Sequence, residues 1–510
     1  MKLVNRKQMT QIDALASTRY HIPSLILMEH AGSAVVNHLC QHNYDKDTSF
    51  LVVCGNGNNG GDGFVIARLL FQRGYHCEVV MAGNRDHLTK DAAQNLAIIE
   101  SLSIDVMDAL PDAYFDIVID CLFGTGLSRT IEGHYRDVVE GINAYKRQGS
   151  TIISVDIPSG IDSDNGSIHG VAVKADVTYT MQCGKCGMYV NEGRIYSNQI
   201  HVLDIAIPQT LIAECESEIE LLEKAQMPAL LPKRSIHSNK GTYGKLLCIG
   251  GSRGMSGAIS MAAESALRCG CGLLTCAIPS SIHAIVAQNI WESMSVVLPE
   301  EDGFISEDAL LILQETIDRM NTILIGCGLG RQKSAEKIVK MLLESEKPLL
   351  IDADGLVALK PHLPLCETRK DLIITPHVKE FADLMGVHVK EVAKNCYSLV
   401  RSFSERYPGV VLVLKSETTL IATSGKCYVN TYGNNGLAVG GSGDVLAGII
   451  AGLYAQCKNA LQAATLGVFL HAYSADLLLE KKSVYSITPQ DIIAQVQQTM
   501  ALLEKEKRYD

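Results

Sequence analysis

Three glycines and one carboxylate lie close together near the C-terminal end of the chain. Residues 434–448 read NNGLAVGGSGDVLAG, and Asp444 directly follows Gly443. The small apolar residues after Asp444 predict a helix, so the glycines form a loop at a helix N-terminus, where backbone N–H groups bind phosphate. An Asp beside a bound phosphate is suited to act as a general base on a hydroxyl group. A helix N-cap is the alternative interpretation of Asp444, and the loop alone favours neither.

A second polar cluster lies near the start of the chain. Residues 55–64 read GNGNNGGDGF and stand between a predicted strand and a predicted helix. This order of elements opens the sheet of many nucleotide-binding α/β proteins. Asn58, Asn59 and Asp62 supply oxygen atoms that suit a hard cation or a ribose as well as a phosphate. A turn without a ligand is the alternative, because Asn, Gly and Asp are the usual turn residues.

Two further carboxylates stand at the ends of apolar runs. Asp120 lies in DIVIDCL, which leads to FGTG, and Asp156 lies in TIISVDI, which leads to PSG. Ligands of open parallel sheets bind just outside the carboxyl ends of the strands, so three polar loops at such ends predict one shared site. Taken singly, each Asp is as typical of a helix cap or a turn.

The elements that must position these loops alternate along the chain. In the first half we predict helix over residues 8–40, interrupted by Pro23, and at 65–73, with strands at 49–54, 77–81, 116–122, 151–157, 176–180 and 200–205. In the second half we predict strands at 238–249, 322–325, 349–351, 371–374 and 410–414 and a helix at 259–269. Such alternation predicts two parallel α/β domains. An acidic, proline-bounded stretch at residues 208–234, with helix at 214–224, is expected to join them.

Composition excludes several classes of protein. A chain of 510 residues exceeds what one hydrophobic core usually serves, and its net charge of −11 argues against nucleic acid as the main partner. No apolar run has membrane-spanning length, and the first residues lack a signal segment. The 16 cysteines are scattered, with Cys183 and Cys186 forming the only CxxC, so we expect reduced thiols, no zinc site and a cytoplasmic location. Lys174 and Lys185 are expected at the surface.

The loops of the first half resemble a known family. NNGGDG at residues 58–63, FGTG at 123–126 and DIPSG at 156–160 are similar to the N-terminal epimerase domain of the bifunctional NAD(P)H-hydrate repair enzymes. That domain has a Rossmann-like fold, interconverts the R and S forms of hydrated NADH or NADPH, and binds potassium. The resemblance implies that the hydrated dinucleotide contacts Asn58, Asn59, Gly60, Gly61, Asp62, Gly124, Thr125, Gly126, Leu127, Ser128, Arg129, Thr130 and Asp156. It implies potassium at Asn59, Asp120 and Ser159, which leaves Asp156 to act on the hydrate ring as acid or base.

The second half resembles the dehydratase domain of the same family, which has a ribokinase-like fold. The motifs are GGSRGMSGA at residues 250–258, GLG at 328–330, TPH at 375–377 followed by Glu380, and GGSGDVLAG at 440–448. The resemblance implies that the hydrate contacts Ala258, Gly328, His377 and Asp444. It implies that ADP lies on Lys415, Ser416, Glu417, Thr418, Thr419, Asn434, Gly440, Gly441, Ser442 and Gly443.

Some residues depart from the family pattern. Cys327 stands where members commonly have Pro, and Ser416 and Glu417 stand where they often have Gly and Ala. Glu417 would repel a phosphate unless its side chain points away. Alone, Lys415 is typical of a solvated lysine at a strand end, and His377 of a loop histidine satisfied by Glu380.

The resemblance implies two domains and two reactions. Residues 1–215 form a Rossmann-like three-layer α/β/α epimerase domain, and residues 216–510 form a ribokinase-like α/β dehydratase domain. The dehydratase consumes ADP, gives AMP and phosphate, uses Asp444 as the base and requires Mg²⁺ to neutralise the phosphates. The expected partners are small molecules and a second copy of the chain. A sugar or vitamin kinase of the same fold, and a dinucleotide sensor without turnover, are the alternatives.

Overall fold

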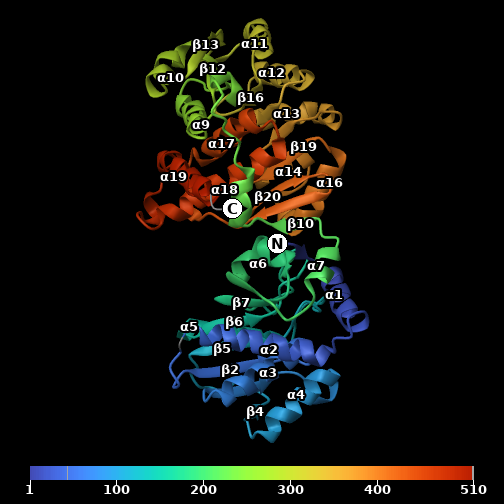
Figure 1. The fold of residues 1–510 in the computed structure, drawn as a ribbon. Coiled ribbons are helices and arrows are strands. Elements are labelled where there is room, and N and C mark those ends of the chain that lie inside the picture. The colour runs from blue at the N-terminus through green and yellow to red at the C-terminus, as the bar shows by residue number, and fades with distance from the viewer. Residues whose placement is uncertain (43, 508–510) are drawn as a thin grey trace. The chain divides into compact units, whose positions relative to one another are not determined.

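The computed structural model describes residues 1–42 and 44–507 and divides the chain into two compact units (Figure 1). The first unit is Met1–Ile219 and the second is Glu220–Asp510. Within the described residues, no helix is long and apolar enough to cross a membrane. All sixteen cysteines lie in the described residues and form no disulfide.

The first unit contains a seven-stranded sheet in which every pairing is parallel. Its order is β4 (Val106–Met107), β3 (His76–Met81), β2 (Ser49–Cys54), β5 (Ile117–Cys121), β6 (Thr151–Val155), β7 (Val177–Met181) and β9 (Gln199–Leu203). From β2 the chain builds the sheet first on one side and then, from β5, on the other. Ligands bind at such a switch point, and the loops after β2 and β5 both lie there.

Helices cover both faces of this sheet. They are α1 (Arg6–Thr18), α2 (Ser24–Cys40), α3 (Asn58–Gln72), α4 (Lys90–Ser101), α5 (His134–Gln148), α6 (Asn191–Ser197) and α7 (Gln209–Glu214), with 3-10 turns η1 (Arg85–His87) and η2 (Cys186–Tyr189). Alternate residues of β2 enter different cores: Phe50 and Val52 pack with α2, α3 and α4, whereas Leu51 and Val53 pack with α5. The expected three-layer α/β/α arrangement is therefore confirmed.

Two short strands pair within the first unit, and the linker leads into the second sheet. β1 (Leu3–Val4) pairs in parallel with β8 (Gly184–Lys185). The helix expected at residues 214–224 is wrong: α7 ends at Glu214, and β10 (Ile219–Leu221) joins the edge of the second sheet beside β21 (Lys426–Asn430). The main chain of Leu222 also bonds to Val429 in that strand, which explains why an acidic stretch is extended there.

The second unit contains a ten-stranded sheet. Its order is β10, β21, β20 (Thr419–Thr423), β19 (Val410–Leu414), β18 (Leu372–Ile374), β17 (Leu349–Ile351), β16 (Thr322–Ile325), β11 (Lys245–Ile249), β12 (Leu273–Pro279) and β13 (Met294–Leu298). Pairings from β19 to β13 are parallel, as expected for this domain, whereas β20 pairs antiparallel with both β19 and β21. The links between these last strands are too short for a parallel crossover. A small hairpin, β14 (Glu300–Glu301) and β15 (Phe304–Ile305), stands apart.

The helices of the second unit are α8 (Met227–Leu230), α9 (Ser256–Arg268), α10 (His283–Asn289), α11 (Ala309–Asp318), α12 (Lys333–Glu344), α13 (Asp354–Leu359), α14 (Val378–Met385), α15 (Val389–Lys394), α16 (Cys396–Arg406), α17 (Ser442–Cys457), α18 (Ala460–Leu478) and α19 (Pro489–Lys507). The 3-10 turns are η3 (Lys224–Gln226), η4 (Lys240–Tyr243), η5 (Ser280–Ile282), η6 (Lys360–Glu367), η7 (Asn435–Leu437) and η8 (Val484–Ser486).

α17 is almost wholly buried against α9. A Cβ at Gly448 would lie 2.0 Å from the Ala262 carbonyl oxygen, so glycine permits this close packing, which fixes the start of α17.

Candidate functional site

The NNGGD run of the first unit is the first turn of α3, not a loop. Gly57 caps the helix, which begins at Asn58. A Cβ at Gly60 would lie 1.9 Å from the carbonyl oxygen of Gly55, so the glycine lets the helix start directly against the end of β2. Backbone N–H groups of a first helical turn have no partner within the helix, and such a turn at a sheet switch point is suited to bind an anionic ligand.

The side-chain amide of Asn59 is buried and forms no hydrogen bond within the described residues. Its side chain is 8% exposed, and within the described residues neither its oxygen nor its nitrogen forms a hydrogen bond. A buried polar group in this state costs about 1–3 kcal/mol, which a bound ligand or ion would offset. A Cβ placed on Gly124 would lie 2.9 Å from Asp156 Oδ2 and 3.6 Å from Asn59 Cγ, so residues of three different loops meet here.

Asp156 forms an ion pair with a lysine that the sequence analysis placed at the surface. Lys185 is fully buried, and its Nζ lies 2.6 Å from Asp156 Oδ1. The other carboxylate oxygen of Asp156 accepts a hydrogen bond of 3.2 Å from the Thr125 amide. Asp156 has a left-handed backbone with φ of 69°, which is uncommon for a residue with a side chain and recurs at functional sites.

Two more carboxylates interact electrostatically with Asp156 and Lys185. Burial raises the pKa of Asp13 to about 6; the Lys185 ammonium lowers it and the Asp156 carboxylate raises it. Burial also raises the pKa of Asp62 well above its ordinary value, and Asp156 and Asp13 raise it further while Lys185 lowers it. Four ionisable groups from α1, α3, the end of β6 and β8 therefore interact at the site.

The two oxygen donors expected beside Asn59 are bonded to one another. Ser159 Oγ donates to Asp120 Oδ1 at 2.6 Å, and its main-chain N–H donates to Oδ2 at 2.9 Å. Ser154 and Leu122 supply two further hydrogen bonds to the carboxylate. Burial raises the pKa of Asp120, although these hydrogen bonds lower it.

The remaining segment expected to contact the dinucleotide borders solvent. Gly126, Ser128, Arg129 and Thr130 are exposed, and Leu127 is half-buried. The Leu127 amide closes a turn on the Gly124 carbonyl at 3.3 Å. The buried part of the first site is thus formed by the α3 turn and the ends of β5 and β6.

In the second unit, the glycine-rich loop leads directly into α17. Gly441 caps the helix in a left-handed conformation with φ of 95°, and α17 begins at Ser442, earlier than expected. The Ser442 hydroxyl is hydrogen-bonded to Nε2 of buried His471 at 3.2 Å. Asn434 donates to Asp476 Oδ1 at 3.2 Å, and the same carboxylate accepts the Gly433 amide at 2.8 Å. The segment expected to bind ADP is therefore anchored at both ends to α18.

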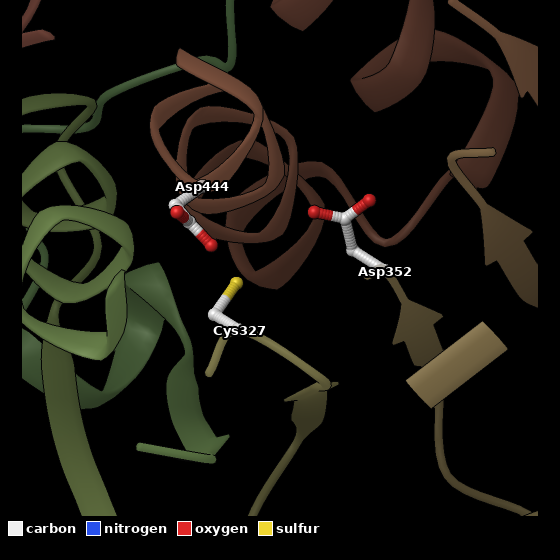
Figure 2. Close-up of side chains that lie close together, drawn as sticks. All are labelled: Cys327, Asp352 and Asp444. Atoms are coloured by element: carbon white, nitrogen blue, oxygen red, sulfur yellow. The ribbon is translucent and has the colours of Figure 1, made fainter. Parts of the chain in front are cut away.

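Asp444 lies in the first turn of α17 and faces two other groups (Figure 2). Its carboxylate, the Cys327 sulfur and the Asp352 carboxylate have ligand atoms within 4.8 Å of one another. Burial, and then the Asp352 charge, raise the pKa of Asp444 to about 6, while a hydrogen bond from Cys327 and the charge of Lys415 lower it. Burial raises the pKa of Cys327 well above its ordinary value, so the thiol is protonated and acts as the donor.

Lys415 belongs to the same cluster and is not a solvated lysine. Its Nζ lies 2.8 Å from Asp352 Oδ1, which also accepts the Thr375 hydroxyl at 2.7 Å. Burial alone would lower the pKa of Lys415, but the Asp352 carboxylate raises it above its ordinary value. The same ammonium lies 3.5 Å from the position of a Cβ on Gly443, so a fixed positive charge stands beside the glycine-rich loop.

The other residues expected at this site lie on neighbouring strand ends. His377 caps α14: its Nδ1 accepts hydrogen bonds from the amides of Lys379 and Glu380, and its Nε2 lies 3.4 Å from Glu380 Oε1. An isolated bridge aligns His377 with Lys415. A Cβ on Gly328 would lie 3.1 Å from the Ala258 Cβ, so these two residues are also adjacent.

The polar side chains of the turn between β19 and β20 differ in their exposure to solvent. Ser416 and Glu417 are exposed, so Glu417 can point to solvent and away from a phosphate. The Thr418 hydroxyl is buried and has no hydrogen-bond partner within the described residues. Thr419 is the first residue of β20.

Known proteins and family models match both halves of the chain. Residues 246–498 match the family model of NAD(P)H-hydrate dehydratase, and residues 24–187 match that of the YjeF-related protein N-terminus. The bifunctional NAD(P)H-hydrate repair enzyme of Moorella thermoacetica is 35% identical over 99% of this chain and 98% of its own. The chain belongs to the family of bifunctional NAD(P)H-hydrate repair enzymes.

A second member of the NAD(P)H-hydrate repair family and a solved ribokinase-like structure are also similar to this chain. The enzyme of that name from Coxiella burnetii is 34% identical over 94% of this chain and 95% of its own. A solved ribokinase-like superfamily protein from Enterococcus faecalis is 28% identical, with a TM-score of 0.51, over 56% of this chain and 96% of its own. The ribokinase-like fold expected for the second unit is therefore confirmed.

Sequence reasoning missed two residues of these candidate sites in the NAD(P)H-hydrate repair family member. Asp352 follows β17 just as Asp120 and Asp156 end their strands, so its position was a usable signal. Lys185 is the only charged residue between Val177 and Asn191. A lone charge within an uncharged stretch is more typical of a buried, paired group than of a surface lysine.

Proposed function

We propose that this chain repairs hydrated NADH and NADPH in two steps. The first unit epimerises the R and S forms of the hydrate, and the second dehydrates the S form at the expense of ADP. The division of labour follows the two units and the two expected domains, residues 1–215 and 216–510. The observation that carries the proposal is the cluster of Asp444, Lys415 and Asp352 at the start of α17.

The dehydration begins with phosphoryl transfer. Asp444 takes the proton of the hydroxyl at C6 of the hydrated ring, and that oxygen attacks the terminal phosphorus of ADP, which releases AMP. Phosphate then leaves from C6 while C5 loses a proton to solvent, which restores the double bond. An Asp with a pKa of about 6 is a stronger base than an ordinary carboxylate and is still largely ionised at neutral pH.

The charge that develops on the phosphate is stabilised by this chain's own groups. Gly440, Gly441 and Gly443 lie at the N-terminus of α17, where free amides and the helix dipole are suited to stabilise a phosphate. Lys415, held by Asp352, adds a fixed positive charge beside the loop. Ser442 and Asn434 belong to the same segment, and their bonds to α18 hold it in one conformation.

Magnesium fits the carboxylates of this site. Mg²⁺ prefers hard oxygen ligands and is usually bound by one or two carboxylates together with substrate phosphates. Asp352 would hold the ion, and the protonated Cys327 thiol, a soft group, would not. When bound, the ion neutralises phosphate oxygens during transfer.

For the epimerase we infer a site between the α3 turn and the ends of β5 and β6. The unpaired Asn59 amide and the Oδ2 atom of Asp156 both border the Gly124 position, which supports contact with the hydrated ring. Asp156 acts there as acid or base, with the segment at residues 124–130, which borders solvent, and the helix turn at residues 58–62 around the dinucleotide.

Potassium fits the oxygen donors of Asn59, Asp120 and Ser159. Among them only Asp120 carries a full charge, and a large monovalent ion tolerates such a nearly neutral set. The buried Asn59 oxygen still lacks a partner within the described residues, which supports an ion there. Since Asp120 and Ser159 bind each other, the ion would also order the loop after β6. A cytoplasmic location and a homo-oligomeric assembly stay predictions.

The proposal is tested with the purified full-length chain, ADP and chemically hydrated NADH. Return of reduced-nicotinamide absorbance, together with AMP and phosphate in equal amounts, supports it. A stable phosphorylated hydrate would instead indicate a kinase, and binding without either product a sensor.

A further inference from the structure

Lys185 carries a charge in the interior of the first unit. Its side chain is 0% exposed, whereas lysines are almost never fully buried unless they are paired. β8 places it there by pairing with β1, with Lys185 in register with Val4. Taking an ammonium out of water is costly, so its retention requires strong compensation from fixed partners.

All three N–H groups of the Lys185 ammonium have acceptors. Nζ lies 2.6 Å from Asp156 Oδ1, 2.8 Å from Thr180 Oγ1 and 3.1 Å from the Met181 carbonyl oxygen. An ammonium has three donors and no acceptor, so the group is satisfied and its orientation is fixed. Two of these partners belong to β7, which pairs with β6 and β9, so the ammonium is anchored to the sheet.

The consequence for Asp156 is that its two oxygens have different surroundings. Oδ1 is bound to the buried ammonium, while Oδ2 lies toward Gly124 and accepts a 3.2 Å hydrogen bond from the Thr125 amide. The side chain is 17% exposed, so it remains reachable by substrate. One oxygen is held and the other is left for chemistry.

The surrounding charges make this anchor necessary. Asp156 interacts with the carboxylates of Asp13 on α1 and Asp62 on α3, and like charges repel. The Lys185 ammonium attracts all three and offsets that repulsion. It also holds a residue whose left-handed backbone is strained, and such strain persists only where neighbours fix it.

We propose that Lys185 is the positioning residue of the epimerase site, fixing Asp156 through Oδ1 so that Oδ2 is presented to the hydrated ring. The inference rests on the proposed epimerase function. Lys185 does not touch the reacting atoms; it acts through Asp156. A misplaced acid–base group loses most of its catalytic effect even when the fold is intact, since such effects depend on geometry to within about 1 Å.

The test is a double-mutant cycle in the full-length chain. The variants are Lys185→Met, Asp156→Asn and the double variant, with Lys174→Met as the matched control, since Lys174 is exposed on the same unit. R-to-S epimerisation is followed by NMR. In the same samples, ADP-dependent dehydration of the pure S form reports whether the second unit is intact, and thermal melting reports folding.

Lys185→Met is expected to lower the kcat of epimerisation by about 100-fold or more with little change in KM, because proton transfer is lost and binding is kept. The double variant should be no slower than Asp156→Asn, because a residue that acts only through Asp156 has no separate effect. Dehydration, and all properties of Lys174→Met, should be unchanged.

Epimerisation by Lys185→Met within about threefold of wild type, or losses that multiply in the double variant, would overturn the inference. If Lys185→Met does not fold, Lys185→Gln replaces it, since glutamine keeps hydrogen-bond donors without the charge. A folded Lys185→Gln variant that epimerises slowly supports the inference. A folded variant that epimerises at the wild-type rate contradicts it. A wild-type chain that does not epimerise at all would refute the proposed epimerase instead.

Discussion

The thiol of Cys327, just after β16, donates a hydrogen bond to the carboxylate of Asp444 at the start of α17. Figure 2 shows the two side chains next to each other. This chain has Cys at a position where the family resemblance leads us to expect Pro, and a Pro could not make that contact. The bond lowers the pKa of Asp444, which burial and Asp352 raise. The reactivity of the proposed base is thus set by opposing neighbours.

The pH dependence of dehydration follows from Asp444. Its pKa is raised to about 6, and a base works only when deprotonated. The value of kcat/KM should therefore be constant at neutral pH and fall tenfold per unit as the pH drops below about 6. Steady-state rates with ADP and the S hydrate across this range measure it. A profile that stays flat to well below this pH would exclude Asp444 as the base.

Cys327→Ala should move that profile in a defined direction. Removing the thiol removes a hydrogen bond that favours the ionised carboxylate, so the acid limb should shift to higher pH while the rate at high pH changes little. Ala is small enough to fit the buried site. Cys366→Ala, at a buried cysteine elsewhere in the second unit, is the matched control. A shift to lower pH would show that the thiol does not act as the donor.

Asp444→Asn should abolish dehydration while ADP still binds. The amide keeps the size of the carboxylate but cannot accept the proton, so a loss of about a thousandfold is expected. Rates and ADP titration calorimetry measure the two effects separately. Turnover near that of wild type would contradict the assignment of the base.

Potassium should matter only to the first reaction. Asp120→Ala removes the one charged donor expected at the ion and also the partner of Ser159, so potassium and hydrate should both bind less tightly. Asp156→Ala should instead stop epimerisation with the ion still bound. Thermal melting and epimerase rates in potassium, compared with a large organic cation, provide the measurement. Identical values in both salts would rule out a functional ion.

The sequence predicted much of the fold because apolar runs and polar strand ends are local features. β16, β17 and β19 have the predicted limits, and β2 begins and ends as expected. The sequence failed where tertiary contacts override local pattern. Residues 58–62 look like a loop, yet Gly60 allows helix to start against β2; the acidic linker looks helical, yet β10 pairs with β21.

The candidate sites were predicted from sequence motifs, and charged residues outside those motifs were missed. Asp444 and Asp156 were predicted from their motifs, but their charged partners lie on distant segments. Asp352 and Lys185 were missed, whereas Lys415 was expected only as a contact of ADP. An ion pair between residues far apart in sequence leaves no local pattern. Only the sheet topology brings these strand ends together.

The most direct test of the account is dehydration itself. Purified full-length chain is mixed with ADP, magnesium and the S form of hydrated NADH, and reduced-nicotinamide absorbance is followed while AMP and phosphate are counted. We predict that absorbance returns with one AMP and one phosphate per NADH formed, and that Asp444→Asn under the same conditions gives none. Release of a stable phosphorylated hydrate, or no turnover by a chain that binds both ligands, would contradict the account.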